Sequence, residues 1–209
     1  MPLETSGHVY LIDDDSDIRM HVGALLRLLG YDVKTFAEAT AFVELDMLEY
    51  PAVVILDMSM PGMSGLQVHR CLLQSGCPAT ILYLSGNSER QDIIDAMKAG
   101  AADFLWKPVS RETLALAVSD AMTKSKAVSA RFAQQAKLRA GLDQLSARER
   151  EVFEMMVSGL PNRQIATRLG VRADTVKKHR TVICEKFMVE DTVALIAMSR
   201  EFAVDVPST

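Results

Sequence analysis

The sequence predicts a two-domain protein: a doubly wound α/β domain with a five-stranded parallel sheet, then an all-α domain of four helices. Short apolar segments alternate five times with amphipathic segments in residues 1–123, as in a parallel sheet with helical crossovers. Residues 142–209 carry only helix-period patterns, separated by glycines. The stretch 112–142 has no proline and one glycine, so we expect a largely helical linker over 124–141, with a flexible coil as the alternative.

The alternation places each element of the first domain. The predicted strands are 9–12, 33–36, 53–56, 79–84 and 103–106, and the predicted helices are 16–29, 37–49, 65–74, 90–99 and one beginning near Arg111. We expect Ser16 and Ser110 to be N-caps and Gly30 to end the first helix. In helix 37–49, the inward residues are expected to be Phe42, Leu45 and Leu48.

The third strand ends at a carboxylate. Val53 to Leu56 are continuously apolar, which is typical of a strand buried on both faces, and Asp57 follows directly. In open α/β sheets, ligands bind beyond the carboxyl ends of the strands. We therefore expect Asp57 to be presented at that edge rather than buried. Alone, it could equally be an ordinary surface aspartate.

Other strands of this domain also end in polar residues. Asp13 and Asp14 follow the first strand, Ser85 ends the fourth and Lys107 follows the fifth. Three carboxylates at one edge would repel one another unless a cation joined them, and oxygen ligands favour Mg²⁺, with Mn²⁺ also suitable. Lys107 and Ser85 could stabilise phosphoryl oxygens while Asp57 forms an acyl phosphate. The plainer alternative is a loop-and-cap cluster with a surface lysine.

These residues stand in motifs that resemble the receiver domain of two-component signalling, a flavodoxin-like fold. The motifs are Ile12-Asp13-Asp14-Asp15, the segment from Asp57 through Pro61 and on to Gly65, Ser85-Gly86, Ala96 to Ala101 and Lys107-Pro108. The resemblance implies that Asp57 accepts a phosphoryl group from a histidine kinase. It implies that Asp14, Asp57 and the Ser59 carbonyl ligate Mg²⁺, with Asp13 acting through water.

The same resemblance implies that Ser85 and Lys107 bind the phosphoryl oxygens, that Phe104 swings with the Ser85 hydroxyl, and that the Lys107–Pro108 bond is cis. Core packing is the alternative role for Phe104, and it is the expected role of Trp106.

The charge differs sharply between the two halves. Residues 1–123 hold 8 Lys/Arg and 17 Asp/Glu, a net charge of −9, whereas residues 124–209 hold 15 and 10, a net charge of +5. An acidic half suits a cation-binding module, and a basic half suits a polyanion partner. A solvated basic face would give the same count.

The second half has the pattern of a helix-turn-helix. Ser146 and Glu149 form a capping-box pair, Gly159 ends that helix, and Pro161 or Asn162 begins the next. After a turn at Gly170, Asp174 is expected to precede a third helix, 175–187, and Asp191 to cap a fourth, 192–202. Two short helices joined by a glycine turn, the second rich in basic residues, are typical of DNA-binding proteins.

The third helix carries the candidate DNA contacts, although a solvated basic face is the alternative. They lie in its N-terminal half: Thr175, Lys177, Lys178, His179, Arg180 and Thr181. With the motifs at 145–152, 162–166, 169–171 and 175–180, this half resembles the LuxR-type DNA-binding domain over about 142–200. Together the halves resemble the NarL/FixJ subfamily of response regulators. Lys186-Phe187-Met188-Val189 departs from the usual Lys-Leu-Gly-Val, which puts the dimer geometry in doubt.

The sequence thus predicts a cytoplasmic, phosphorylation-controlled transcription factor that binds double-stranded DNA and forms a homodimer on phosphorylation or on DNA. Residues 1–8 show no signal-peptide pattern and no apolar run suits a membrane span. Three cysteines without zinc-ligand spacing fit a reducing compartment, although a Cys71–Cys77 bridge is conceivable.

Two rival functions use the same residues. An aspartyl-phosphate phosphatase would need a second aspartate two residues after Asp57, where this chain has Ser59. A DNA-binding regulator with a phosphorylation-independent receiver would be expected to lack part of the pocket, yet all five polar residues are present. We therefore do not expect an enzyme beyond self-phosphorylation or autodephosphorylation.

Overall fold

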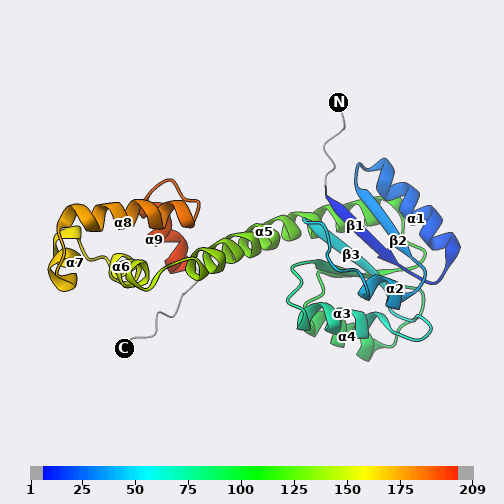
Figure 1. Ribbon diagram of the computed structural model, residues 1–209. Helices are drawn as coiled ribbons and strands as arrows, with labels where there is room; N and C mark the ends of the chain where they lie inside the picture. Colours follow the sequence, from blue (N-terminus) through cyan, green and yellow to red (C-terminus); the bar gives the residue numbers. More distant parts are fainter. Residues whose placement is uncertain (1–6, 202–209) are drawn as a thin grey trace. The chain divides into compact units, whose positions relative to one another are not determined.

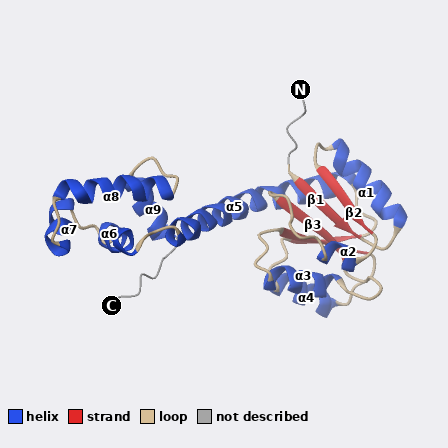
Figure 2. Cartoon of the chain, viewed as in Figure 1, coloured by secondary structure: helices blue, strands red, loops and turns tan. Residues whose placement is uncertain are grey.

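The computed structural model describes residues 7–201, which divide into two compact units that meet within helix α5, between Ala130 and Arg131. The first unit contains a five-stranded parallel sheet in the order β2-β1-β3-β4-β5 (Figure 2). The strands are β1 His8–Ile12, β2 Asp32–Phe36, β3 Ala52–Asp57, β4 Thr80–Ser85 and β5 Asp103–Trp106. The helices are α1 Ser16–Leu28, α2 Ala39–Val43, α3 Gly65–Gln74, α4 Arg90–Lys98 and α5 Arg111–Asp143. The predicted doubly wound sheet is confirmed.

Helices cover both faces of this sheet (Figure 1). Alternate strand residues build two separate cores, because successive side chains of a strand point to opposite faces. One core joins Leu11 and Val53 to α1 and α5; the other joins Tyr10 and Val54 to α2, α3 and α4. Every residue of β3 is buried, so the continuous apolar run was correctly interpreted as a central strand.

The segment 37–49 is not the long helix that its composition predicts. Helix α2 ends at Val43, and Leu45 is 36% exposed, whereas Phe42 and Leu48 are buried as expected. The backbone N–H of Glu49 donates to the buried Tyr10 hydroxyl at 2.8 Å, and Lys34 pairs with the Glu49 carboxylate. These tertiary contacts hold residues 44–51 out of helical geometry, since they direct Glu49 and Leu48 to the sheet.

The predicted start of the first helix is also shifted. Asp15, not Ser16, is the N-cap of α1, and its side chain accepts from the backbone N–H groups of Asp17 and Ile18. These bonds lower the pKa of Asp15. Gly30 has a φ of 89°, as expected for a residue that ends a helix.

The linker prediction is confirmed, because α5 is one helix of 33 residues. Its first part gives Leu114, Val118 and Met122 to the core of the first unit. Its last part gives Leu138 to the core of the second unit. One continuous helix therefore belongs to both cores. Phe132, on the same helix, is 46% exposed.

The second unit holds the predicted four helices. They are α6 Ala147–Val157, α7 Asn162–Leu169, α8 Ala173–Lys186 and α9 Thr192–Glu201. The capping box of Ser146 and Glu149 is present, Gly170 is left-handed, and Asp191 accepts from the N–H of Ala194. Helix α8 begins two residues earlier than predicted, so Asp174 lies in its first turn and Arg172 is the N-cap.

The unusual Phe187-Met188 pair is accommodated by local packing. Phe187 is fully buried, stacked on Phe153 with ring centroids 5.2 Å apart. Its ring lies against Gly141, where an added Cβ would lie 2.5 Å from the Phe187 Cδ1 atom. The glycine near the end of α5 thus makes room for the larger ring. Met188 has a φ of 52°, the only positive φ of a non-glycine residue within 7–201.

Cys71, Cys77 and Cys184 are free, so the conceivable Cys71–Cys77 bridge is absent. Among the helices of residues 7–201, none combines the length and apolar character that crossing a membrane requires.

Met188→Gly should stabilise the second unit. Left-handed backbone costs a non-glycine residue about 1 kcal/mol, and the Met188 side chain is 69% exposed, so little packing is lost. We expect the free energy of unfolding to rise by about that amount, measured by calorimetry of the full chain. The control is Met47→Gly, at an exposed loop methionine without positive φ, which should give no gain. Equal effects at both positions would contradict the strain at Met188.

Glu149→Gln should destabilise the second unit at neutral pH. The carboxylate accepts from Lys186 Nζ at 2.7 Å and from the Ser146 hydroxyl at 2.6 Å, and these bonds lower the pKa of Glu149 to about 2. A lowered native pKa stabilises the fold above the unfolded value of 4.5, and this contribution is lost as the pH falls towards 2.

We therefore expect Glu149→Gln to cost about 2 kcal/mol at pH 7 and progressively less below pH 4.5. Glu151→Gln is the matched control, because Glu151 is on the same helix but pairs with Arg148 at an exposed site. Chemical denaturation at several pH values measures both. A pH-independent loss for Glu149→Gln would contradict the assigned cause.

Candidate functional site

Three carboxylates converge where two neighbouring strands end. Asp13 and Asp14 follow β1, and Asp57 is the last residue of β3. The parallel register pairs Ile12 with Leu56, so the residues that follow emerge side by side. Asp13, Asp14 and Asp57 each offer an oxygen within 4.8 Å of the others. The three carboxylates therefore lie together at the carboxyl ends of β1 and β3, as the strand alternation predicted.

Lys107 supplies the positive charge in this cluster. Its Nζ lies 2.6 Å from Asp13 Oδ2 and 3.4 Å from Asp57 Oδ1. Asp13 is fully buried; its Oδ1 accepts from the N–H of Asp15, while Oδ2 lacks a hydrogen bond of good geometry and relies on the lysine. The Lys107–Pro108 bond is cis, as the resemblance implied.

Asp57 is more buried than expected, with 6% of its surface exposed. It nevertheless lines a pocket of about 400 Å³ with Asp14, Ser59, Ser85 and Lys107. Burial raises the pKa of Asp57; Lys107 lowers it and Asp13 raises it further. The expectation of a presented carboxylate was wrong about exposure, because the loops after β1 and β3 surround the group.

The pocket suits a hard divalent cation. Its donors are carboxylate oxygens, the ligands that Mg²⁺ prefers, and Asp13 Oδ2 is buried with only the ammonium of Lys107 as partner. Receiver domains typically bind Mg²⁺ at such an acidic pocket.

Ser85 and Phe104 lie beside the pocket on neighbouring strands. The Ser85 hydroxyl is buried and lies 2.7 Å from Ser88 Oγ, so it is engaged with the loop before α4. Phe104 is half-buried between Tyr83 and Trp106. Trp106 is 52% exposed, so its predicted core role is wrong: as the last residue of the edge strand β5, it is covered on one side only.

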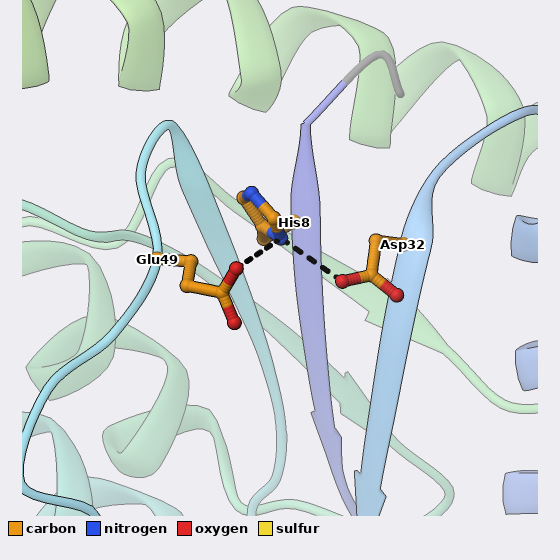
Figure 3. A group of neighbouring side chains, drawn as sticks. All are labelled: His8, Asp32 and Glu49. Atoms are coloured by element: carbon orange, nitrogen blue, oxygen red, sulfur yellow. Dashed lines mark hydrogen bonds and ion pairs between the residues drawn. The ribbon is translucent and has the colours of Figure 1, made fainter. Parts of the chain in front are cut away.

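A second metal-capable group lies at the opposite ends of the strands (Figure 3). His8 Nδ1 is 3.1 Å from Asp32 Oδ2 and 3.9 Å from Glu49 Oε2. Lys34 Nζ lies 2.5 Å from Glu49 Oε1, and this bond lowers the pKa of Glu49. Since Lys34 already supplies a cation, we interpret the group as a surface ion-pair network that holds the loop before β3.

The predicted DNA contacts are divided between exposed and half-buried positions. Lys177, Lys178 and Thr181 are exposed on α8. Thr175, His179 and Arg180 are half-buried. The Arg180 guanidinium donates to the Asn162 side chain at the start of α7, so it joins the two helices.

Sequence reasoning missed a buried polar pair behind the pocket. His69 Nδ1, on α3, is 3.0 Å from the Tyr83 hydroxyl, on β4. The Gly65 carbonyl, at the start of α3, is 3.4 Å from the same hydroxyl. A histidine on the inward face of α3, next to Val68, is the only signal that the sequence offers for this pair.

Comparison with known proteins agrees with this architecture. The family model for the response regulator receiver domain matches residues 9–119, and that for bacterial regulatory proteins of the luxR family matches residues 143–199. The tetrathionate response regulatory protein TtrR of Salmonella typhimurium is 34% identical over 195 residues, covering 93% of each chain.

Two solved structures share the fold over nearly the whole chain. The response regulator StyR has a TM-score of 0.76 at 32% identity, with 93% of this chain and 98% of that chain covered. Full-length FixJ from B. japonicum has a TM-score of 0.57 at 30% identity, with 95% and 98% covered. The chain therefore belongs to the NarL/FixJ family of two-component response regulators, with a receiver domain followed by a LuxR-type DNA-binding domain.

Proposed function

We propose that Asp57 accepts the phosphoryl group of a phosphorylated histidine kinase, and that this modification controls sequence-specific DNA binding by α8. The observation that carries the proposal is the cluster of Asp13, Asp14 and Asp57, in which Lys107 pairs with Asp13 and Asp57. An Asp57 oxygen attacks phosphorus, the bond from phosphorus to the kinase imidazole breaks, and the imidazole keeps that electron pair.

Asp57 is better placed than Asp13 to act as the nucleophile. Both oxygens of Asp13 are occupied, one by the N–H of Asp15 and one by Lys107, and Asp13 does not line the pocket. Asp57 lines the pocket with Lys107 Nζ 3.4 Å away, so the lysine is positioned to neutralise a transferring phosphoryl group.

We propose that Asp13, Asp14, Asp57 and the backbone carbonyl of Ser59 hold Mg²⁺, with Asp13 acting through water; Mn²⁺ would fit the same donors. When bound, the ion neutralises charge on the phosphoryl oxygens. Ser59 also stands where an aspartyl-phosphate phosphatase would carry its second aspartate, so a phosphoacceptor is favoured over an enzyme.

We propose that Ser85 and Phe104 transmit the change. A phosphoryl group on Asp57 offers the Ser85 hydroxyl a charged acceptor stronger than its present partner Ser88. When the hydroxyl turns into the pocket, Phe104 on the neighbouring strand can follow it. A local charge change thereby biases an element that has two positions.

The DNA contacts are proposed for α8. Lys177, Lys178 and Thr181 are exposed and suited to phosphate and base-edge contacts, with Thr175 and His179 beside them. Arg180 is held by Asn162, so we assign it to fixing α8 against α7 as well as to contacting DNA. A cytoplasmic homodimer on paired half-sites is the proposed DNA-bound form.

Asp57→Asn should abolish phosphorylation and stabilise the cation-free protein. Incubation with acetyl phosphate and Mg²⁺, followed by intact-mass measurement, should give a phosphorylated wild type and an unmodified variant. Because burial raises the pKa of Asp57 above 3.8, this group costs stability progressively as the pH rises from 3.8 through the native pKa, and the cost is complete above the native pKa.

In EDTA at pH 7 we therefore expect Asp57→Asn to raise the free energy of unfolding, with the gain shrinking as the pH falls towards 3.8. Asp46→Asn, at an exposed loop carboxylate, is the control and should change neither property. Phosphorylation of the Asp57→Asn variant would disprove the assignment.

Lys178→Ala should weaken binding to DNA sequences selected from a random pool by the full chain. Loss of one phosphate contact is expected to reduce affinity and to lower the slope of log affinity against log salt by about 1. Lys98→Ala, on exposed α4, is the control and should leave the slope unchanged. An unchanged slope for Lys178→Ala would place the DNA elsewhere.

A further inference from the structure

The buried pair of His69 and Tyr83 lies next to the residue proposed to move. Tyr83 is directly opposite Phe104 in the pairing of β4 with β5. Their rings are inclined by only 27° with centroids 6.4 Å apart, and Phe104 in turn meets Trp106 edge-on at 5.1 Å. Phe104 therefore rests between a fully buried ring and a half-exposed one.

The Tyr83 ring is held in place by hydrogen bonds of its hydroxyl to α3. Its hydroxyl is shared between His69 Nδ1 at 3.0 Å and the Gly65 carbonyl at 3.4 Å, and both His69 and Tyr83 are buried. Burial lowers the pKa of His69 and raises that of Tyr83, so both groups stay neutral at physiological pH. A buried hydroxyl that lost these partners would be costly, so the ring has little freedom to shift.

This anchoring reaches the phosphoacceptor strand. Gly65 begins α3 directly against the backbone carbonyl of Asp57, and a Cβ at Gly65 would also lie 3.2 Å from the Tyr83 ring. The N–H of Gly65 donates to the Met58 carbonyl at 3.2 Å. The residues that hold Tyr83 are thus attached to the loop that follows Asp57.

We propose that His69 and Tyr83 are positioning residues for the phosphorylation-linked movement of Phe104. By holding the Tyr83 ring in place, the His69–Tyr83 hydrogen bond stabilises the resting position of Phe104. It sets how much phosphoryl-binding free energy is needed to move that side chain. The inference rests on the proposed function and adds to it a determinant of the switch outside the acidic pocket.

Trp106 gives a direct readout, because it is the only tryptophan of the chain and its indole contacts the Phe104 ring. The full chain is titrated with beryllofluoride, a phosphoryl mimic, in the presence of Mg²⁺, while tryptophan fluorescence is recorded. Tyr83→Phe and His69→Leu each remove the hydrogen bond but keep a buried side chain. We expect each to lower the half-saturating concentration by about two- to tenfold, as loss of one hydrogen bond from the resting state predicts.

The double variant should shift the midpoint no more than Tyr83→Phe alone, because that change already removes the bond to His69. His69→Gln can still hydrogen-bond Tyr83, so it should keep the wild-type midpoint. It is the second variant to measure if one of the others fails to fold.

Tyr10→Phe is the matched control. Tyr10 is a buried tyrosine in the same core, and its hydroxyl also makes one tertiary bond, to the N–H of Glu49, but it lies on β1, separated from β5 by two strands. It should lower stability without moving the midpoint. Unchanged midpoints in Tyr83→Phe and His69→Leu, or an equal shift in Tyr10→Phe, would reduce the pair to ordinary core packing. No fluorescence response in the wild type would instead overturn the proposed switch itself, and this inference with it.

Discussion

The receiver unit depends on keeping three carboxylates together at one sheet edge. Parallel pairing of β1 with β3 forces Asp13 and Asp57 close, and burial makes their mutual repulsion stronger than it would be in water. Lys107, from the far side of β4, reaches across to both and offsets that repulsion. Lys107 does not remove the whole cost of placing charge there, because burial chiefly, and Asp13 in addition, keep the pKa of Asp57 raised.

The two cores of the receiver unit have different partners. The core under α1 and α5 is built mainly from aliphatic side chains, with Tyr31 packed at its margin, and includes the first part of the helix that continues into the second unit. The core under α2, α3 and α4 contains Tyr10, Tyr83 and, at its margin, Phe104, together with hydroxyl groups that need partners. Phe104 is only half-buried at that margin, so its movement would disturb less packing than movement of a fully buried side chain.

Much of this fold could be predicted from local patterns. The all-buried β3, the glycine-ended α1, the capping box at Ser146 and the long α5 follow from periodicity and terminal residues. The five polar residues of the pocket could be placed because parallel strands end at one edge. The failures have a common physical origin in tertiary contacts. Residues 44–49 have helical composition, but Tyr10 and Lys34 hold Glu49 elsewhere. Trp106 is apolar, but it lies on an edge strand.

Tyr10 and Tyr83 show why such contacts are invisible in sequence yet can matter for function. Each is an aromatic residue in an apolar strand, and the pattern assigns both simply to the core. Each phenol, however, must find a partner once it is buried, and the partner comes from a segment distant in the chain: Glu49 for Tyr10, and His69 for Tyr83. The first bond fixes a loop far from the pocket. The second fixes the ring against which Phe104 packs. The same chemical requirement therefore has a structural consequence at one strand and bears on the proposed switch at another.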